Sequence, residues 1–197
     1  MINQVKIVSG RYKRQKITTP GGKTHPMGER ERIALFNVLM SYLDGASVLD
    51  LYAGSGALGI EALSHGAKKV VFVEKNHDAM RTIVTNCKTL GIPEEQTMFY
   101  CGPVASFSEK NDQNSNKFIA PTTDGVIDFP RQFDIIIADP PYDNFHPEEI
   151  VKITDGYLAA NGILALSHPE KTPEFPKMKL VKTNKYSAAH LSFYKFA

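Results

Sequence analysis

The sequence predicts an α/β protein whose centre is a doubly wound, mostly parallel sheet, and three observations predict it. Between residues 47 and 101, short apolar runs alternate with stretches of helical periodicity in the order strand, helix, strand, helix, strand. This order is typical of a parallel sheet with crossover helices. A glycine-rich loop at residues 54–59 follows the first strand. A later apolar run, residues 133–138, predicts a strand buried on both faces.

The composition fits one globular domain without covalent or metal staples. The chain has 197 residues, of which 42% are hydrophobic and 22% charged, so it can bury a substantial core. No apolar run approaches membrane-spanning length and the first residues lack the core of a signal peptide, so we expect no membrane contact. The cysteine usage fits a reduced, cytoplasmic setting. The sequence does not specify the oligomeric state, and a monomer is the default expectation. Cys87 and Cys101 have neither zinc-site nor disulfide-framework spacing, so we expect no metal.

Positive charge is concentrated at the start of the chain. Residues 1–32 contain eight lysines and arginines but only two acids, whereas the whole chain carries only +2. We expect residues 1–28 to form a basic β extension with a loop, ahead of a main domain over residues 29–197. The asymmetry predicts an anionic partner such as nucleic acid, and the alternative is a solvated basic arm.

A helix is predicted over residues 29–43, because apolar residues recur at helical spacing and acids lie in its first turn. The face expected to be buried consists of Ile33, Phe36, Asn37, Met40 and Leu43. Leu35 and Leu39 lie beside this face.

The other expected elements follow at spacings typical of this fold class. A polar stretch, residues 108–130, interrupts them and is expected to be a surface insertion. The remaining helices are expected at residues 57–65, 77–90 and 147–158, and the strands at residues 47–53, 69–74, 97–101, 133–138, 162–167, 179–183 and 191–196, the last two as an antiparallel closing pair.

The glycine loop and its flanking acids indicate a nucleoside-containing cofactor. The loop matches the dinucleotide fingerprint, and Glu74 lies 20 residues after Gly54, where a carboxylate can accept ribose hydroxyls. This pattern suits both NAD and S-adenosylmethionine. Asp50 favours S-adenosylmethionine, because a carboxylate attracts the ammonium and sulfonium groups but repels a pyrophosphate. The alternative is that Asp50 caps the following helix.

The residues expected to bind this cofactor lie at the ends of two strands and in the loop between them: Asp50, Tyr52, Ala53, Gly54, Ser55, Gly56, Glu74 and Lys75.

A second motif, Asp139-Pro140-Pro141-Tyr142, follows the apolar run at residues 133–138. Ligands of open α/β sheets bind at the carboxyl ends of strands, and the prolines stiffen this turn. The Asp139 carboxylate and the Pro140 carbonyl can each accept one hydrogen of an exocyclic amine, which holds the nitrogen in line with a methyl donor. Tyr142 can stack on the base, which must be unpaired or flipped out. The alternative is a proline-rich loop with an incidental acid.

Further distinctive segments lie at residues 7–17, 24–27, 30–37 and 191–194. Together with the two motifs, they resemble class I S-adenosylmethionine-dependent methyltransferases. Over nearly the full length the chain resembles the bacterial family that methylates guanine N2 in 16S ribosomal RNA of the small subunit. Asp-Pro-Pro-Tyr alone is shared with adenine-N6 and glutamine methyltransferases.

The resemblance implies a Rossmann-like fold with an antiparallel C-terminal strand and a small N-terminal β extension. It also implies S-adenosylmethionine as cofactor, the Asp139–Tyr142 turn as base site, and ribosomal RNA or a partly assembled small subunit as partner. The residues implied to contact RNA are basic and lie near the N-terminus: Arg11, Lys13, Arg14, Lys16, His25, Arg30 and Arg32.

The chain departs from the family pattern at two positions near these sites. His25 stands where an arginine is usual, and Pro103 stands where an aspartate is usual. These changes bear on affinity and substrate fit. Three alternatives to guanine-N2 methylation remain at this stage: adenine-N6 methylation of DNA or RNA, an NAD-linked oxidoreductase, and a non-catalytic RNA-binding assembly factor.

Overall fold

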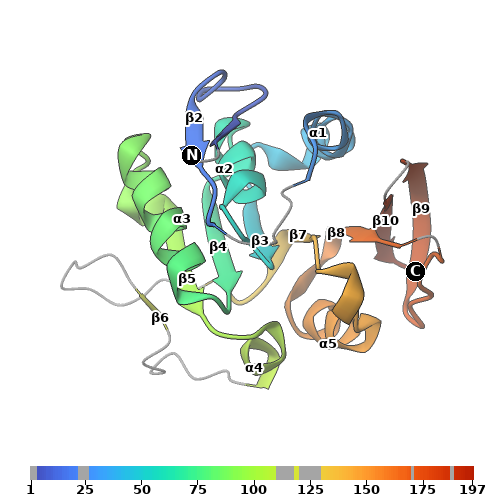
Figure 1. The fold of residues 1–197 in the computed structure, drawn as a ribbon. Coiled ribbons are helices and arrows are strands. Elements are labelled where there is room, and N and C mark those ends of the chain that lie inside the picture. Colours follow the sequence, from blue (N-terminus) through green and yellow to red (C-terminus); the bar gives the residue numbers. More distant parts are fainter. Residues whose placement is uncertain (1–3, 22–26, 110–117, 120–129, 170, 187–188) are drawn as a thin grey trace.

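The structure, a computed structural model, has an eight-stranded mixed sheet at its centre, with helices on both faces and a small two-stranded sheet at one side (Figure 1). The residues that it describes are 4–21, 27–109, 118–119, 130–169, 171–186 and 189–197.

The strand order of the large sheet is β6-β5-β4-β3-β7-β8-β10-β9. Neighbours from β5 to β8 pair in parallel, whereas β6 pairs antiparallel with β5, and β10 pairs antiparallel with both β8 and β9. The expected Rossmann-like sheet with an antiparallel C-terminal strand is therefore confirmed. The strands are β3 (Ser47–Leu51), β4 (Lys69–Glu74), β5 (Thr97–Cys101), β6 (Phe118–Ile119), β7 (Phe133–Ala138), β8 (Leu158–His168), β9 (Met178–Lys185) and β10 (His190–Phe196).

The strand order reverses next to β3, which lies between β4 and β7. Asp50 of β3 pairs in register with Ile137 of β7 on one side and with Phe72 of β4 on the other. The carboxyl ends of the three strands therefore meet at one edge of the sheet. This switch point is where open α/β sheets bind their ligands.

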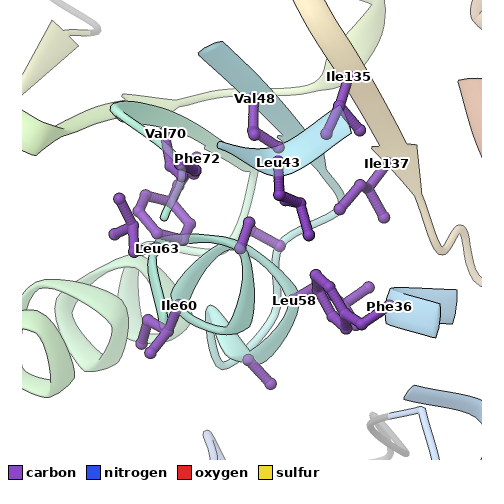
Figure 2. Close-up of a cluster of buried hydrophobic side chains, with 14 of the residues drawn as sticks. Phe36, Leu43, Val48, Leu58, Ile60, Leu63, Val70, Phe72, Ile135 and Ile137 are labelled. Carbon is purple, nitrogen blue, oxygen red and sulfur yellow. The ribbon is translucent and has the colours of Figure 1, made fainter. Parts of the chain in front are cut away.

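Each face of the sheet has its own hydrophobic core. The first three helices and the N-terminal hairpin cover one face, and the last two helices cover the other. Figure 2 shows side chains of the first core, among them Phe36, Leu43 and Leu63, gathered against Val48 and Phe72 of the strands. The helices are α1 (Glu29–Leu43), α2 (Ala57–Ser64), α3 (His77–Thr89), α4 (Val104–Glu109) and α5 (Pro147–Tyr157).

The buried side of α1 differs from the expected one. Ile33 is 43% exposed, Met40 is 49% exposed and Asn37 faces solvent. The buried residues Leu35, Phe36, Leu39 and Leu43 share their side with Arg32, whose charge is directed inward. The apolar spacing alone misplaced this face because it treated Arg32 as a surface residue.

The N-terminal hairpin consists of β1 (Gln4–Lys6) and β2 (Lys16–Thr18), which pair antiparallel. Residues 11–14, within the expected basic β extension, form a turn in which Arg14 has φ 68°. The turn ends the first strand early, and its cations project from a loop.

The hairpin is fastened to α2 and α3 rather than standing apart. Ile7, Tyr12 and Ile17 are buried in the same core as α1. Asn86 of α3 accepts the Thr18 N–H at 2.9 Å and donates to the Thr18 carbonyl at 2.9 Å. The basic extension and the α/β layer therefore share one core.

The expected insertion at residues 108–130 contains regular structure at its start and in its middle. Helix α4 extends to Glu109, and β6 adds a short strand to the edge of the sheet beside β5. Residues 110–117 and 120–129 lie outside the described part of the chain. Strand β8 begins at Leu158, earlier than expected. Among the described helices, none combines the length and apolar character that a membrane span requires.

Candidate active site

Asp50 lies at the end of β3 and is almost completely buried. Its Oδ2 accepts the backbone N–H of Gly59 at 2.9 Å, so this oxygen does cap the start of α2. Its Oδ1 is also buried, yet it has no hydrogen-bond partner among the described residues. Capping therefore accounts for one oxygen, and the other is available to a ligand that can donate a hydrogen bond.

The electrostatic environment of Asp50 is negative. Burial raises the pKa of Asp50 to about 8, the Gly59 hydrogen bond opposes that rise, and Asp139 and Glu74 add charge repulsion. The three carboxylates come from the ends of adjacent strands β7, β3 and β4. Such a cluster disfavours an anion and favours a cation with hydrogen-bond donors.

The glycine loop folds through backbone conformations that suit glycine. Gly54 and Gly56 have φ 56° and 78°, and Tyr52 also adopts a positive φ of 59°. The Ala53 carbonyl accepts the Gly56 N–H at 2.7 Å, which closes a tight turn. A Cβ at Gly59 would overlap the Phe72 ring, so glycine allows α2 to pack closely on the sheet.

Glu74 fastens this loop to the next strand and helix. Its Oε2 accepts the Gly54 N–H at 2.9 Å, and its Oε1 accepts the Asn76 N–H at 2.8 Å. Asn76 in turn caps α3. A carboxylate has about four acceptor sites, so Glu74 can still accept ribose hydroxyls. Lys75 is exposed beside it.

Two of the remaining loop residues make contacts that the sequence did not suggest. The Tyr52 hydroxyl donates to Glu149 Oε2 of α5 at 3.1 Å, and burial together with the Glu149 charge raises the pKa of Tyr52. The buried Ser55 accepts a hydrogen bond on its carbonyl from Asn86, the residue that holds the hairpin. The loop is therefore connected to both α5 and the N-terminal extension.

The Asp139–Tyr142 turn follows β7, as expected, and Tyr142 begins a short 3-10 helix, Tyr142–Asn144. Burial raises the pKa of Asp139 to about 6, and a hydrogen bond from Ser167 opposes the rise. The Tyr142 and Ser167 hydroxyls are 2.6 Å apart. Tyr142 is 37% exposed, so its hydroxyl is held while part of its ring faces solvent.

Ser167 is the residue of this site that the sequence analysis missed. It lies near the end of β8, and the register between Ala138 and Leu166 places it beside Asp139. The signal was present, because a polar residue ends the predicted strand at residues 162–167, and carboxyl ends of parallel strands share one edge. What the sequence lacked was the adjacency of β7 and β8.

Five of the seven residues predicted to contact RNA are exposed. Arg11, Lys13, Arg14 and Lys16 project from the hairpin, and Arg30 lies on the first turn of α1. His25 lies outside the described residues. RNA contact by these residues stays a prediction.

The prediction for Arg32 is wrong, because its side chain is only 4% exposed. Its guanidinium donates to the carbonyls of Met27 at 2.6 Å and Lys6 at 2.9 Å, and its Nε lies 3.5 Å from Glu61 Oε1. Glu61 Oε1 also accepts the Val8 N–H at 2.7 Å. Arg32 therefore joins the hairpin to α1 and α2 and cannot reach RNA.

Comparison with known proteins identifies the family. Residues 5–195 match the family model described as "Conserved hypothetical protein 95". The chain belongs to this family. It is 28% identical to ribosomal RNA small subunit methyltransferase D of Haemophilus influenzae, over 86% of this chain and 81% of the relative. It is 26% identical to the protein of the same name from Escherichia coli K12, over 82% of this chain and 73% of the relative. The expected family resemblance is thereby confirmed.

Solved structures support the same fold. The Escherichia coli protein yhhF has a TM-score of 0.82 and 24% identity, covering 98% of each chain. A Thermus thermophilus protein has a TM-score of 0.76 and 25% identity, covering 97% of this chain and 99% of the other. A Streptococcus mutans protein described as "A putative sam-dependent methyltransferase" has a TM-score of 0.69 at 13% identity, covering 91% of this chain and 53% of the other, which bears on the fold alone.

Proposed function

We propose that this chain transfers a methyl group from S-adenosylmethionine to the exocyclic N2 amine of a guanine in small-subunit ribosomal RNA. The observation that carries the proposal is the convergence of Asp50, Glu74 and Asp139 at the carboxyl ends of three adjacent strands. The names of the family relatives, which are ribosomal RNA small subunit methyltransferases, support the choice of substrate.

The donor set around Asp50 fits this cofactor. Asp50 Oδ1 is a buried acceptor without a partner among the described residues, and it suits the cofactor's ammonium group. Glu74 suits the ribose hydroxyls, and the Gly54 and Gly56 backbone gives the close approach that a nucleoside needs. When bound, the cofactor supplies an electrophilic methyl group on a sulfonium. Its positive charge offsets the mutual repulsion of the three carboxylates.

The turn after β7 positions the nucleophile. Asp139 is ionised at pH 7, because its pKa is about 6, and it accepts one amine hydrogen while the Pro140 carbonyl accepts the other. With the cofactor bound, the amine nitrogen would take the methyl group as the sulfur–carbon bond broke, S-adenosylhomocysteine would leave with that bond's electron pair, and Asp139 could take the proton that the nitrogen then loses. Tyr142, held by Ser167, presents its ring to the base.

The hairpin supplies the electrostatic attraction to RNA. Arg11, Lys13, Arg14 and Lys16 are exposed and can contact phosphates, a contact whose strength falls with salt concentration. The buried Arg32–Glu61 pair keeps the hairpin in one position relative to α2. A guanine must leave its helix to reach Asp139.

The experiment is a turnover assay with isotopically labelled S-adenosylmethionine, on naked small-subunit ribosomal RNA and on small subunits, followed by nucleoside digestion. We expect labelled N2-methylguanosine. Labelled N6-methyladenosine would replace this proposal with the adenine alternative, which the shared Asp139–Tyr142 motif also allows. Absence of label in every nucleoside would leave the assembly-factor alternative.

A variant separates chemistry from binding. Asp139→Ala is expected to abolish labelling while calorimetry shows cofactor binding within a few-fold of the unaltered protein, because Asp50 and Glu74 remain. Asp134→Ala is the matched control, since Asp134 lies on β7, the strand that leads to Asp139, but is exposed and accepts the Ser47 N–H. Equal turnover by the Asp139 variant would remove that residue from the mechanism.

A further inference from the structure

The two last strands carry a second concentration of positive charge. Residues 175–197 contain five lysines and no acidic residue. One of the five, Lys177, is neutralised by Asp155 of α5 at 2.7 Å. Lys179, Lys182 and Lys195 form no ion pair with an acid in the described part of the chain.

The strand register puts these three lysines on one face of the sheet. Lys179 pairs with Lys195, and Lys182 pairs with Phe193. Directly paired residues project to the same face, and Phe193 belongs to the core beneath α1. Lys195 confirms the placement, because its Nζ lies 5.1 Å from the centroid of the Tyr42 ring of α1. The row therefore lies on the α1 side.

The N-terminal hairpin lies on the same side, since its buried residues share that core. Figure 1 shows α1 between the hairpin and the β10–β9 edge. Helix α1 itself exposes Glu29, Arg30, Ile33 and Met40. Strand β9 is the outermost strand, three strands from β7, which corresponds to about 14 Å at normal strand spacing. The hairpin and the lysine row therefore lie on either side of α1. In the strand register Lys182 is level with Ile137 of β7, and Lys179 and Lys195 lie further toward the start of that strand.

We propose that Lys179, Lys182 and Lys195 form a second contact for the phosphate backbone of RNA, continuing the basic surface of the hairpin across the α1 side. This inference rests on the proposed function for its ligand. Charge complementarity favours RNA, because ammonium groups on a rigid strand bind phosphates as point charges. Residues 1–32 carry a net charge of +6 and the whole chain carries +2, so residues 33–197 carry a net charge of −4. The net charge of the main domain therefore opposes RNA binding, and a local row of cations offers RNA a favourable contact on it.

The competing explanation is protection of the sheet edge. Edge strands commonly carry lysines that prevent pairing with another chain, and Leu180 and Val181 of β9 are half-exposed. Under that explanation, loss of the lysines changes the association state of the protein and leaves RNA binding unchanged. The two explanations therefore predict different measurements on the same variant.

The test is the variant Lys179→Gln/Lys182→Gln/Lys195→Gln, with RNA affinity measured against salt concentration on transcribed small-subunit ribosomal RNA. The slope of log affinity against log salt concentration is negative. We expect its magnitude to decrease by about 2 to 3, because each lost phosphate contact removes roughly 0.7 to 0.9. Because Lys195 packs on Tyr42, its substitution could also disturb the fold. The double variant Lys179→Gln/Lys182→Gln is therefore measured as well, and the magnitude of its slope should decrease by about 1.4 to 1.8.

The matched control removes the same charge elsewhere. Lys68, Lys88 and Lys152 are exposed and lie before β4, on α3 and on α5; their triple glutamine variant should keep the slope. An unchanged slope in both the triple and the double variant would overturn the inference, whether or not analytical ultracentrifugation detects new dimers. The proposed function fails separately: RNA affinity that depends on these lysines without any N2-methylguanosine would retain this surface and reject the activity.

Discussion

Cofactor binding should release a proton near neutral pH, and Asp50 is its expected source. The buried Asp50 carboxyl has a pKa raised to about 8 by burial and by Asp139 and Glu74. At pH 7 about nine-tenths of it is protonated before binding, one pH unit below its pKa. A cation beside Oδ1 favours the ionised form. We therefore expect about 0.9 proton to be released per cofactor bound at pH 7.

The same linkage fixes the pH dependence of affinity. Below pH 8 the ionised fraction of Asp50 rises nearly tenfold per pH unit, and it reaches about half at pH 8. Affinity for S-adenosylmethionine should therefore rise about 50-fold between pH 6 and pH 8, and then level off.

The assay is isothermal titration calorimetry in two buffers of different ionisation enthalpy. Asp50→Asn is the control, because its amide oxygen can still accept the Gly59 N–H, but it cannot ionise. The variant should bind more weakly and show neither proton release nor the pH dependence. Enthalpies that do not depend on the buffer, together with constant affinity from pH 6 to pH 8, would refute the reasoning.

Stability without cofactor should change in the opposite direction. In the unfolded chain Asp50 has the ordinary aspartate pKa of 3.8, so between pH 4 and pH 8 the native state holds a proton that the unfolded state has lost. The free energy of unfolding then falls by about 1.4 kcal/mol per pH unit from this group. In urea denaturation, the free energy of unfolding of Asp50→Asn should therefore increase relative to that of the unaltered protein by about the same amount for each pH unit.

Three further substitutions test packing and positioning. Glu61→Gln leaves the buried Arg32 charge without its partner and should lower the free energy of unfolding by about 3 kcal/mol, measured in urea. Gly59→Ala places a methyl group against the Phe72 ring and should cost about 1 to 3 kcal/mol, partly recovered by adding Phe72→Leu. Ser167→Ala removes the hydrogen bond that lowers the pKa of Asp139, so the acid limb of the pH–activity profile should move to higher pH and turnover should fall about tenfold.

Each of these has a decisive contrary result. Unchanged urea midpoints for the Glu61 variant would mean that the pair contributes nothing to hairpin docking. Full stability of Gly59→Ala would show that α2 can move away from the sheet. For Ser167, the threonine variant keeps the hydroxyl and should show the pH–activity profile of the unaltered protein. If Ser167→Ala leaves the acid limb of that profile in place, Ser167 does not influence the pKa of Asp139.

Local patterns in the sequence predicted most elements and the acids of the site. The helix Glu29–Leu43 and the strands Lys69–Glu74 and Phe133–Ala138 have their expected bounds. Apolar period, turn residues and helix caps act over a few neighbouring residues, so the sequence shows them directly. The edge of the sheet that collects Asp50 and Asp139 also followed, because carboxyl ends of parallel strands coincide.

Only the tertiary structure decided what the buried polar groups contact. Arg32 was expected on the surface, but Glu61 and two backbone carbonyls hold it inside. Ser167 and Glu149 entered the site through strand and helix neighbours that no local pattern specifies. A buried charge is tolerated only with its partner, and such partners lie far apart in the chain. The sequence therefore determined which groups are the candidates for the chemistry, and the fold determined how each is held.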